Sequence, residues 1–197
     1  MSNIFYFMGK SASGKDTLFS KVREKMPQLR TLVGYTTRPA REHEKNGREY
    51  FFVTEEKMNQ LESEGKMIEK RVYHTVHGIW YYFTADDGQV IENGPDYLLI
   101  GTLESYVKIR NYYGEDKVVP IYIEVEDGIR LKRAIEREEQ QEKPGYAEVC
   151  RRFLADAEDF KEENIEKCGI KKRFHNLDFS ICLDEICQYI KERQTDR

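Results

Sequence analysis

The sequence has no long hydrophobic run. Its longest apolar stretches, around residues 96–101 and 118–125, fall far short of the about 18 consecutive apolar residues that a membrane-spanning helix needs. The first residues lead directly into a short strand-like run and show nothing typical of an export signal. We therefore expect no membrane partner.

Cysteine is scarce and scattered. The 4 cysteines form no Cys-x-x-Cys pair and have no Cys/His spacing suited to zinc. This pattern argues against a disulfide framework and favours free thiols in a reducing compartment, so we expect a cytoplasmic protein. The cysteines are Cys150, Cys168, Cys182 and Cys187.

The chain also lacks blocks of like charge, internal repeats and low-complexity segments. Its 32 basic and 36 acidic residues are mixed and give a net charge of -4, so binding to a nucleic acid polymer is not expected. A charged fraction of 35% predicts a heavily solvated surface, while 10 Phe and 13 Tyr exclude a mainly disordered chain. A length of 197 residues fits one domain, or one domain with an inserted subdomain.

The beginning of the chain has the pattern of a parallel α/β fold. Residues 4–8 form an apolar and aromatic run that ends at Gly9, and residues 17–26 repeat apolar side chains at helical spacing. Further strands are predicted over residues 31–35, 97–100 and 119–125. The strand, glycine loop and helix therefore open a parallel sheet.

A compact insert and a charged helical pair complete the predicted elements. Strands over residues 50–53, 67–73 and 79–83, with a helix over 55–63, predict the insert. Thr84 precedes two acids in the manner of a helix cap, so a short helix is predicted from there to Gly94. Other helices are predicted over residues 103–112, 126–142, 146–165 and 179–191.

The strongest local signal is a GxxxxGK motif between the first strand and the first helix. Small residues let backbone N–H groups surround phosphate oxygens, the helix N-terminus adds positive potential, and the lysine bridges the outer phosphates. The usual Ser or Thr after Lys15 is replaced by Asp16, whose carboxylate is also a hard oxygen ligand and is the predicted Mg²⁺ ligand. The residues predicted to bind ATP are Gly9, Ser11, Ala12, Ser13, Gly14, Lys15, Asp16 and Thr17.

A second motif occupies the polar segment over residues 36–50. Arg38 and Arg41 carry planar guanidinium groups that suit a phosphate, and the phenol of Tyr50 can complete the phosphate shell. The segment resembles the nucleoside-monophosphate loop of guanylate kinase, TTRxxRxxExxGxxY, at every specified position and at the same spacing. In a chain that also has a phosphate loop, these arginines favour an acceptor site over a solvated polar face.

The resemblance to guanylate kinase covers nearly the whole chain and implies further roles. It implies that Glu69 accepts hydrogen bonds from guanine and that Asn176 lies near the adenine of ATP. The other acceptor-site residues it implies are Tyr81 and Thr84. The arginines it implies as a lid over the transferred phosphate are Arg133, Arg137 and Arg152, which with Lys15 and Arg38 form the predicted catalytic set.

Two departures from the guanylate kinase pattern leave the acceptor open. The strand that carries Asp-x-Asp in that family reads Leu99-Ile100-Gly101-Thr102 here, and Gly34-Tyr35 stands where the family has a serine before TTR. Ribose 1,5-bisphosphate phosphokinases also carry GKD followed by a hydroxyl residue and lack the Asp-x-Asp strand, so a sugar-phosphate kinase is one alternative. A non-catalytic guanylate-kinase-like binding module is another, although such modules usually have a degraded phosphate loop.

The sequence thus predicts an α/β P-loop NTPase with a five-stranded parallel core sheet. We expect a core of residues 1–34, 84–125 and 161–197, an acceptor-binding insert of residues 35–83, and a helical lid of residues 126–160. The predicted activity is ATP- and Mg²⁺-dependent phosphorylation of a nucleoside monophosphate, with GMP or dGMP as the first choice. A monomer or a homodimer is expected.

Overall fold

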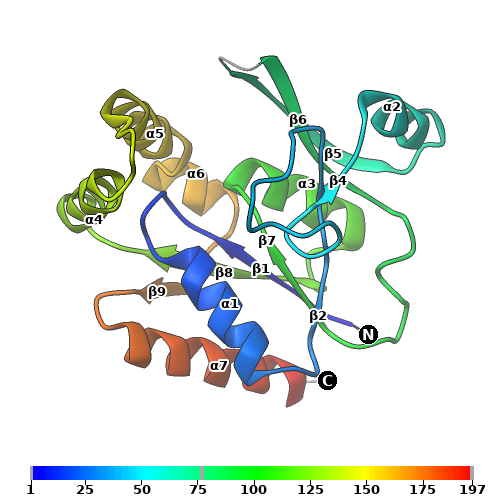
Figure 1. Cartoon of the computed structure of the whole chain (residues 1–197). Coiled ribbons are helices and arrows are strands. Elements are labelled where there is room, and N and C mark those ends of the chain that lie inside the picture. The colour runs from blue at the N-terminus through cyan, green and yellow to red at the C-terminus, as the bar shows by residue number, and fades with distance from the viewer. Residues whose placement is uncertain (1, 76–77, 196–197) are drawn as a thin grey trace.

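The computed structural model describes residues 2–75 and 78–195 and contains two sheets with helices around them (Figure 1). The larger sheet has five parallel strands in the order β2-β7-β1-β8-β9. In chain order these are β1 (Ile4–Met8), β2 (Arg30–Thr31), β7 (Tyr97–Ile100), β8 (Val118–Glu124) and β9 (Arg173–His175). The predicted α/β class with a five-stranded parallel core is confirmed.

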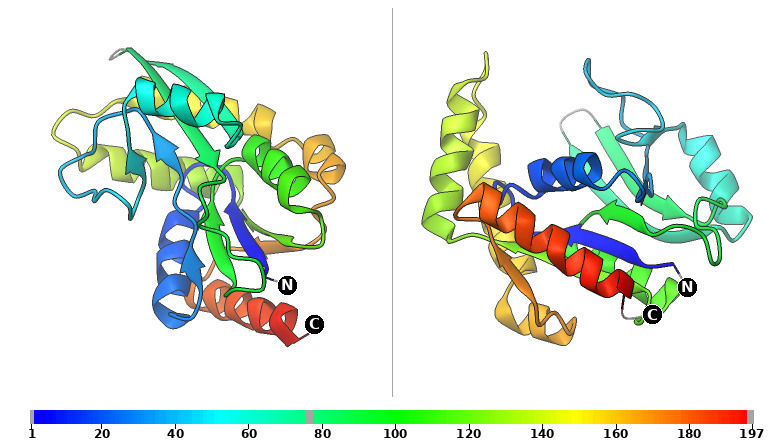
Figure 2. Two further views of the ribbon diagram at one scale, coloured as in Figure 1. Left: turned by 90° about the vertical axis from the view of Figure 1, so that its right-hand side faces the viewer. Right: turned by 90° about the horizontal axis from the view of Figure 1, so that it is seen from below.

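Alternation along β1 divides the main core into two layers. Phe5 and Phe7 are fully buried against α1 (Lys15–Lys25) and α7 (Phe179–Thr195) on one face of the sheet. Tyr6 and Met8 point the other way, toward α3 (Leu103–Tyr113) and α6 (Glu162–Lys167). Figure 2 shows α1 and α7 together on one side of the central strands. Because strand side chains alternate in direction, one short strand supplies both layers.

The second sheet is built from residues 35–85 and has the order β4-β3-β6-β5. Its strands are β3 (Tyr35–Thr36), β4 (Phe51–Phe52), β5 (Met67–Thr75) and β6 (Gly78–Ala85). Helix α2 (Glu55–Ser63) buries Met58 and Leu61 against Tyr35 and Phe83, which forms a separate small core. The side chain of Thr54 caps α2 by accepting a hydrogen bond from the Lys57 N–H.

Two charged helices, α4 (Asp127–Glu139) and α5 (Tyr146–Asp159), form a pair. In Figure 1 this pair stands on one side of α1, while the β5–β6 ribbon and α2 stand on the other. The N-terminal end of α1, where the GxxxxGK loop lies, is therefore between the two extensions of the fold.

Three predicted elements need correction, and one strand was missed. The strand predicted over residues 31–35 is two short strands in different sheets, β2 and β3, because the chain crosses between the sheets there. The helix predicted from Thr84 to Gly94 is wrong: Thr84 lies within β6, and its hydroxyl donates to Glu69 instead of capping a helix. The helix predicted over residues 146–165 ends at Asp159, and α6 begins at Glu162. Strand β9 was not predicted, since only three residues pair with β8.

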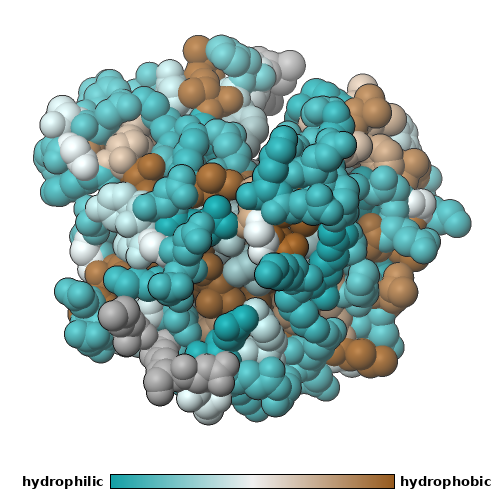
Figure 3. Space-filling view, turned by 180° about the vertical axis from the view of Figure 1, so that it is seen from behind, coloured by the Kyte–Doolittle hydropathy of each residue, from teal (hydrophilic) through white to brown (hydrophobic). Residues whose placement is uncertain are grey.

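The surface agrees with the composition. On the face opposite to that of Figure 1, hydrophilic residues predominate and hydrophobic ones form small groups between them (Figure 3). None of the described helices is both long and apolar enough to cross a bilayer. All the cysteines are free thiols, as expected, with Cys150 exposed and the others buried.

Candidate active site

The GxxxxGK loop joins the end of β1 to the start of α1 and requires glycine at two positions. Gly14 has a φ of 84°, and a Cβ there would lie 2.4 Å from the Asn176 Nδ2 atom. A Cβ on Gly9 would lie 2.5 Å from the carbonyl oxygen of Ile123. The loop is thus packed closely against β8 and the segment after β9, which fixes its curvature.

Asn176 and Arg133 connect the loop to the lid helices. The Asn176 side-chain amide donates to the Ser13 carbonyl oxygen at 2.8 Å, and Arg133 Nη2 donates to the Asn176 carbonyl at 3.2 Å. The Ser13 hydroxyl is buried without a hydrogen-bond partner among the described residues. A buried polar atom without a partner is unfavourable, so this hydroxyl fits a loop that gains contacts from a bound phosphate.

Lys15 and Asp16 begin α1. The Lys15 Nζ atom lies 3.0 Å from the Asp16 carboxylate, whose side chain is 81% exposed, and Thr17 is also exposed. Across residues 2–75 and 78–195, no cluster of three or more His, Cys, Asp or Glu side chains is arranged to hold a metal ion. A single exposed carboxylate beside the phosphate loop still fits Mg²⁺, which usually binds one or two carboxylates, substrate phosphates and water.

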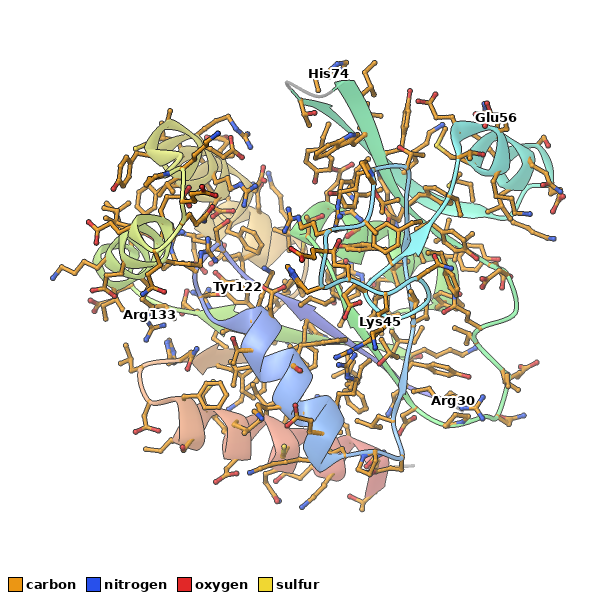
Figure 4. All side chains as sticks on the ribbon, in the orientation of Figure 1. Arg30, Lys45, Glu56, His74, Tyr122 and Arg133 are labelled. Atoms are coloured by element: carbon orange, nitrogen blue, oxygen red, sulfur yellow. The ribbon has the colours of Figure 1, made fainter. Side chains whose placement is uncertain are left out.

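The predicted arginines other than Arg38 divide between two places. Arg41, Arg137 and Arg152 line one cavity of about 630 Å³ between the loop after β3 and the helices α4 and α5. Arg133 instead contacts Asn176, as described above. Figure 4 shows Arg133 on α4 and Lys45, in the loop after β3, on opposite sides of α1. The cavity therefore receives cationic side chains from both extensions of the fold.

A buried arginine that the sequence analysis did not single out ties α4 and α5 to the phosphate loop. Arg130 is 1% exposed and donates to Asp127 and Asp156 and to the Ser11 carbonyl oxygen. Asp156 in turn accepts from the Ser11 N–H at 2.7 Å, and the Arg130 guanidinium lies 4.4 Å from the centre of the Phe153 ring. No sequence spacing reveals this contact, because it joins residues more than a hundred positions apart.

Arg38, predicted as a phosphate ligand, is largely occupied in this structure. Its side chain is 4% exposed, and Nη1 and Nη2 each donate to Glu44 at 2.6 Å. Nε donates to the Tyr82 hydroxyl, and Nη1 also donates to the Pro39 carbonyl oxygen. The hydrogen bonds from Arg38 hold the pKa of the Glu44 carboxyl at about 2, well below its ordinary value. Arg38 thus retains a single free N–H on Nη2 for a phosphate.

Of the two adjacent tyrosines in β6, Tyr82 lies beside Arg38 and Tyr50, whereas the predicted Tyr81 does not. Tyr82 faces Tyr50, with ring centres 5.5 Å apart, and shares that face of the sheet with Arg38. Tyr81 points the other way and packs against the small core around Met58. Adjacent strand residues face opposite sides of a sheet, so only one of the two tyrosines can face Arg38. The pKa of the half-buried Tyr50 phenol is raised, chiefly by burial, so it is protonated at neutral pH.

Glu69 and Thr84, predicted separately, meet in the structure. The Thr84 hydroxyl donates to Glu69 Oε1 at 2.9 Å. Arg71, which the sequence analysis did not name, donates to both carboxylate oxygens, through Nε at 3.0 Å and Nη2 at 3.2 Å. Alternation along β5 could have suggested Arg71, because residues 69, 71 and 73 share one face of a strand.

A parallel sheet, a glycine-rich loop before α1, and an arginine-lined cavity beside that loop define a P-loop nucleotide-binding protein. A family model described as guanylate kinase matches residues 2–156. The guanylate kinase of Malacoplasma penetrans is 30% identical over 194 residues, covering 92% of this chain and 85% of its own length. The chain belongs to the guanylate kinase family.

Other relatives match shorter segments. The guanylate kinase of Thermotoga maritima is 29% identical over 140 residues, and that of Koribacter versatilis is 33% identical over 135. These matches cover 68% and 66% of this chain but only 66% and 56% of the relatives. The crystal structure of guanylate kinase from Anaplasma phagocytophilum superposes with a TM-score of 0.62 at 24% identity, covering 98% of this chain and 87% of that one, which shows a shared fold.

The Arg38–Glu44 pair predicts a pH-dependent stability. Because the folded pKa of Glu44 lies below its ordinary value of 4.5, the pair stabilises the fold above pH 4.5, and this stability is lost as the pH falls through about 2. Glu44→Gln should lower the free energy of unfolding by about 3 kcal/mol at pH 7, since it leaves a buried guanidinium unpaired. Urea unfolding at pH 7 and pH 3 should show that more than half of this difference is gone at the lower pH.

The matched control is Glu42→Gln in the same loop, where the side chain is exposed. It should leave the unfolding free energy within about 0.5 kcal/mol of wild type at both pH values. A Glu44→Gln deficit of equal size at pH 7 and pH 3 would contradict the assigned ion pair.

Proposed function

We propose that this protein transfers the γ-phosphoryl group of ATP to a nucleoside monophosphate, with GMP or dGMP as the acceptor. The observation that supports this most is the position of the arginine-lined cavity. It lies beside the phosphate loop at Ser11 and is lined from the other side by Arg41, which belongs to the acceptor motif. A donor phosphate and an acceptor phosphate can therefore approach each other there.

The donor is held by the phosphate loop. Backbone N–H groups of the loop and the N-terminus of α1 provide positive potential for the phosphates of ATP. Lys15 would neutralise negative charge on the phosphoryl group as it leaves ADP, together with Arg137 and Arg152 from the lid helices. Asn176, which packs on the loop, would lie near the adenine.

The acceptor phosphate would be bound by Arg41 and Tyr50, with one N–H from Arg38. The guanidinium of Arg41 makes no hydrogen bond or ion pair with the described residues, so both of its faces remain available to a ligand. A phosphate monoester is already an anionic nucleophile, so no general base is needed. Positioning and charge neutralisation then account for the rate.

Mg²⁺ fits beside the loop, where Asp16 would be its protein ligand. The ion would reduce the negative charge on the phosphates of ATP. Asp16 supplies one hard oxygen donor, and its pairing with Lys15 keeps the two side chains adjacent at the start of α1.

The proposal extends to the organisation of the chain. Residues 35–83 would form the acceptor-binding part, residues 126–160 the lid, and the remainder the core. We also propose a cytoplasmic location and a monomeric or homodimeric state, with ATP and the nucleoside monophosphate as the partners.

A sugar-phosphate kinase is the second candidate. It is favoured by one observation: β7 ends at Leu99-Ile100, Gly101 follows it, and neither brings a carboxylate to the acceptor site that could read a base amino group. A ribose phosphate would bind without such a group.

The test is ADP release measured across GMP, dGMP, AMP, UMP and ribose 1,5-bisphosphate with purified wild type and Lys15→Ala. We expect the highest kcat/KM with GMP or dGMP and a loss of at least a hundredfold in Lys15→Ala. The melting temperature should be unchanged, because Lys15 acts on transferred charge and pairs in this structure with the exposed carboxylate of Asp16. Turnover of ribose 1,5-bisphosphate alone would favour the second candidate. Equal turnover in wild type and Lys15→Ala would exclude the loop as the catalytic centre.

Arg41→Ala should raise the KM for the acceptor more than the KM for ATP. Its guanidinium is assigned to the acceptor phosphate, so KM for GMP should rise about tenfold to a hundredfold while KM for ATP changes less than threefold. Arg48→Ala is the control, since Arg48 is an exposed arginine of the same loop paired with Glu49. An equal rise of both KM values in Arg41→Ala would contradict the assignment.

Asp16→Asn should raise the Mg²⁺ concentration needed for half-maximal rate, because the amide keeps an oxygen but loses the charge. A carboxylate in the first turn of α1 could instead act only on the helix dipole, which is worth about 0.3–1 kcal/mol of stability. Mg²⁺ titrations of wild type, Asp16→Asn and Glu24→Gln distinguish these readings, since Glu24 is an exposed carboxylate further along α1. Superimposable curves for all three proteins would remove Asp16 from the metal site.

A further inference from the structure

The carboxylate of Glu69 is covered by an arginine. The Glu69 side chain is 0% exposed, whereas that of Arg71, which pairs with it, is 15% exposed. Glu69 Oε1 accepts from Thr84 and Arg71, and Oε2 accepts from Arg71. A ligand that arrives on this face of β5 therefore meets the guanidinium before it meets the carboxylate.

Arg71 keeps hydrogen-bonding capacity for such a ligand. A guanidinium has five N–H donors, and the contacts with Glu69 use two of them, one on Nε and one on Nη2. Although burial alone would lower it, the pKa of Arg71 is raised by the charge and hydrogen bonds of Glu69, so the group stays cationic. The remaining donors lie on Nη1 and Nη2, in the fork that suits two adjacent acceptor atoms.

The neighbouring edge of the core sheet cannot supply a second carboxylate. Gly101 follows β7, and a Cβ there would lie 2.1 Å from the Tyr6 hydroxyl oxygen. Tyr6 is fully buried and hydrogen-bonded to Ser105 and to the Thr102 carbonyl oxygen. The Tyr6 hydroxyl therefore fills the space that any side chain at position 101 would need.

We propose that Arg71 is the specificity-determining residue for the base, reading the O6 and N7 acceptors of a 6-oxopurine while Glu69 holds it in place. This inference rests on the proposed function. Two adjacent acceptors on a purine edge match the guanidinium fork, as when arginine reads guanine in DNA. The 2-amino group is left unread, so IMP should be used nearly as well as GMP. AMP presents an N–H donor at position 6 and is rejected.

A second phosphate group on the acceptor, as in a sugar bisphosphate, would be a poorer ligand for Arg71 than the edge of a purine. Glu69 already neutralises the guanidinium, and its buried carboxylate would repel another anion placed at the same group. A neutral carbonyl oxygen and a ring nitrogen accept hydrogen bonds from the free donors without this repulsion.

The experiment measures kcat/KM for GMP, IMP and AMP in wild type, Arg71→Ala, Arg71→Lys and Lys70→Ala. Wild type should use IMP within about tenfold of GMP and AMP at least a hundredfold less well. Arg71→Ala should lower kcat/KM for GMP and IMP by a similar factor, about tenfold to a hundredfold, mainly through KM, and leave AMP unchanged. Arg71→Lys keeps the positive charge but lacks the two-pronged guanidinium, so its kcat/KM for GMP and IMP should lie between those of wild type and Arg71→Ala.

Lys70→Ala is the matched control because Lys70 is the adjacent residue of β5 and pairs with Glu62 on the opposite face. It should behave as wild type. A wild type that prefers GMP over IMP by more than a hundredfold, or an Arg71→Ala variant with an increased GMP to IMP ratio, would overturn the proposal in favour of direct reading by Glu69. The wild-type ratio decides even if Arg71→Ala fails to fold. A lack of activity with every nucleotide would instead refute the proposed function.

Discussion

A buried guanidinium must be paired with a carboxylate, and this constraint shapes the whole candidate site. Removing a charge from water costs several kcal/mol unless an opposite charge and hydrogen bonds compensate it. Three arginines near the site satisfy the requirement in different places: Arg38 with Glu44, Arg71 with Glu69, and Arg130 with Asp127 and Asp156. Each pair fixes a side chain before a ligand is present. Arg41 and Arg137 make no such pair with the described residues, so their guanidinium groups are available to bind the phosphates of the substrates.

The features that the sequence predicts well are local. The phosphate loop is readable because glycine positions, a lysine and a following helix are contiguous, and the structure shows why Gly14 is needed beside Asn176. The arginine loop after β3 is likewise continuous in sequence. Its pairing is less readable, because a motif that contains Arg38 and Glu44 does not tell whether they bind a ligand or each other. The buried bidentate geometry is a property of the folded loop.

The features that the sequence did not predict depend on register or on distant contacts. Tyr81 and Tyr82 are equivalent in composition, and only the pairing of β6 with β3 and β5 decides which one faces Arg38. Strand β9 is too short to show a periodic pattern and exists because β8 offers it an edge. The residues after Thr84 resemble a helix start, yet Asp86 and Asp87 bind Tyr112 and Tyr35, so tertiary contacts override the local preference.

The contacts of Arg130 with Asp127, Asp156 and Ser11 also fix the position of α4 and α5 relative to the phosphate loop. Asp156 on α5 accepts a hydrogen bond from the Ser11 N–H, and Arg130 on α4 donates one to the Ser11 carbonyl oxygen. Both backbone groups of this loop residue are therefore bound by the two helices. Arg137 and Arg152 stand on the same two helices. Their distance from the loop is therefore set by a network centred on the buried Arg130, which itself lines part of the cavity. Electrostatic stabilisation of a transferred phosphoryl group depends on donors that are already in place, because reorienting them during the reaction would cost part of their effect. Here the ion pairs of the buried Arg130 supply that positioning, while Arg137 makes no ion pair with the described residues and Arg152 pairs with Glu148.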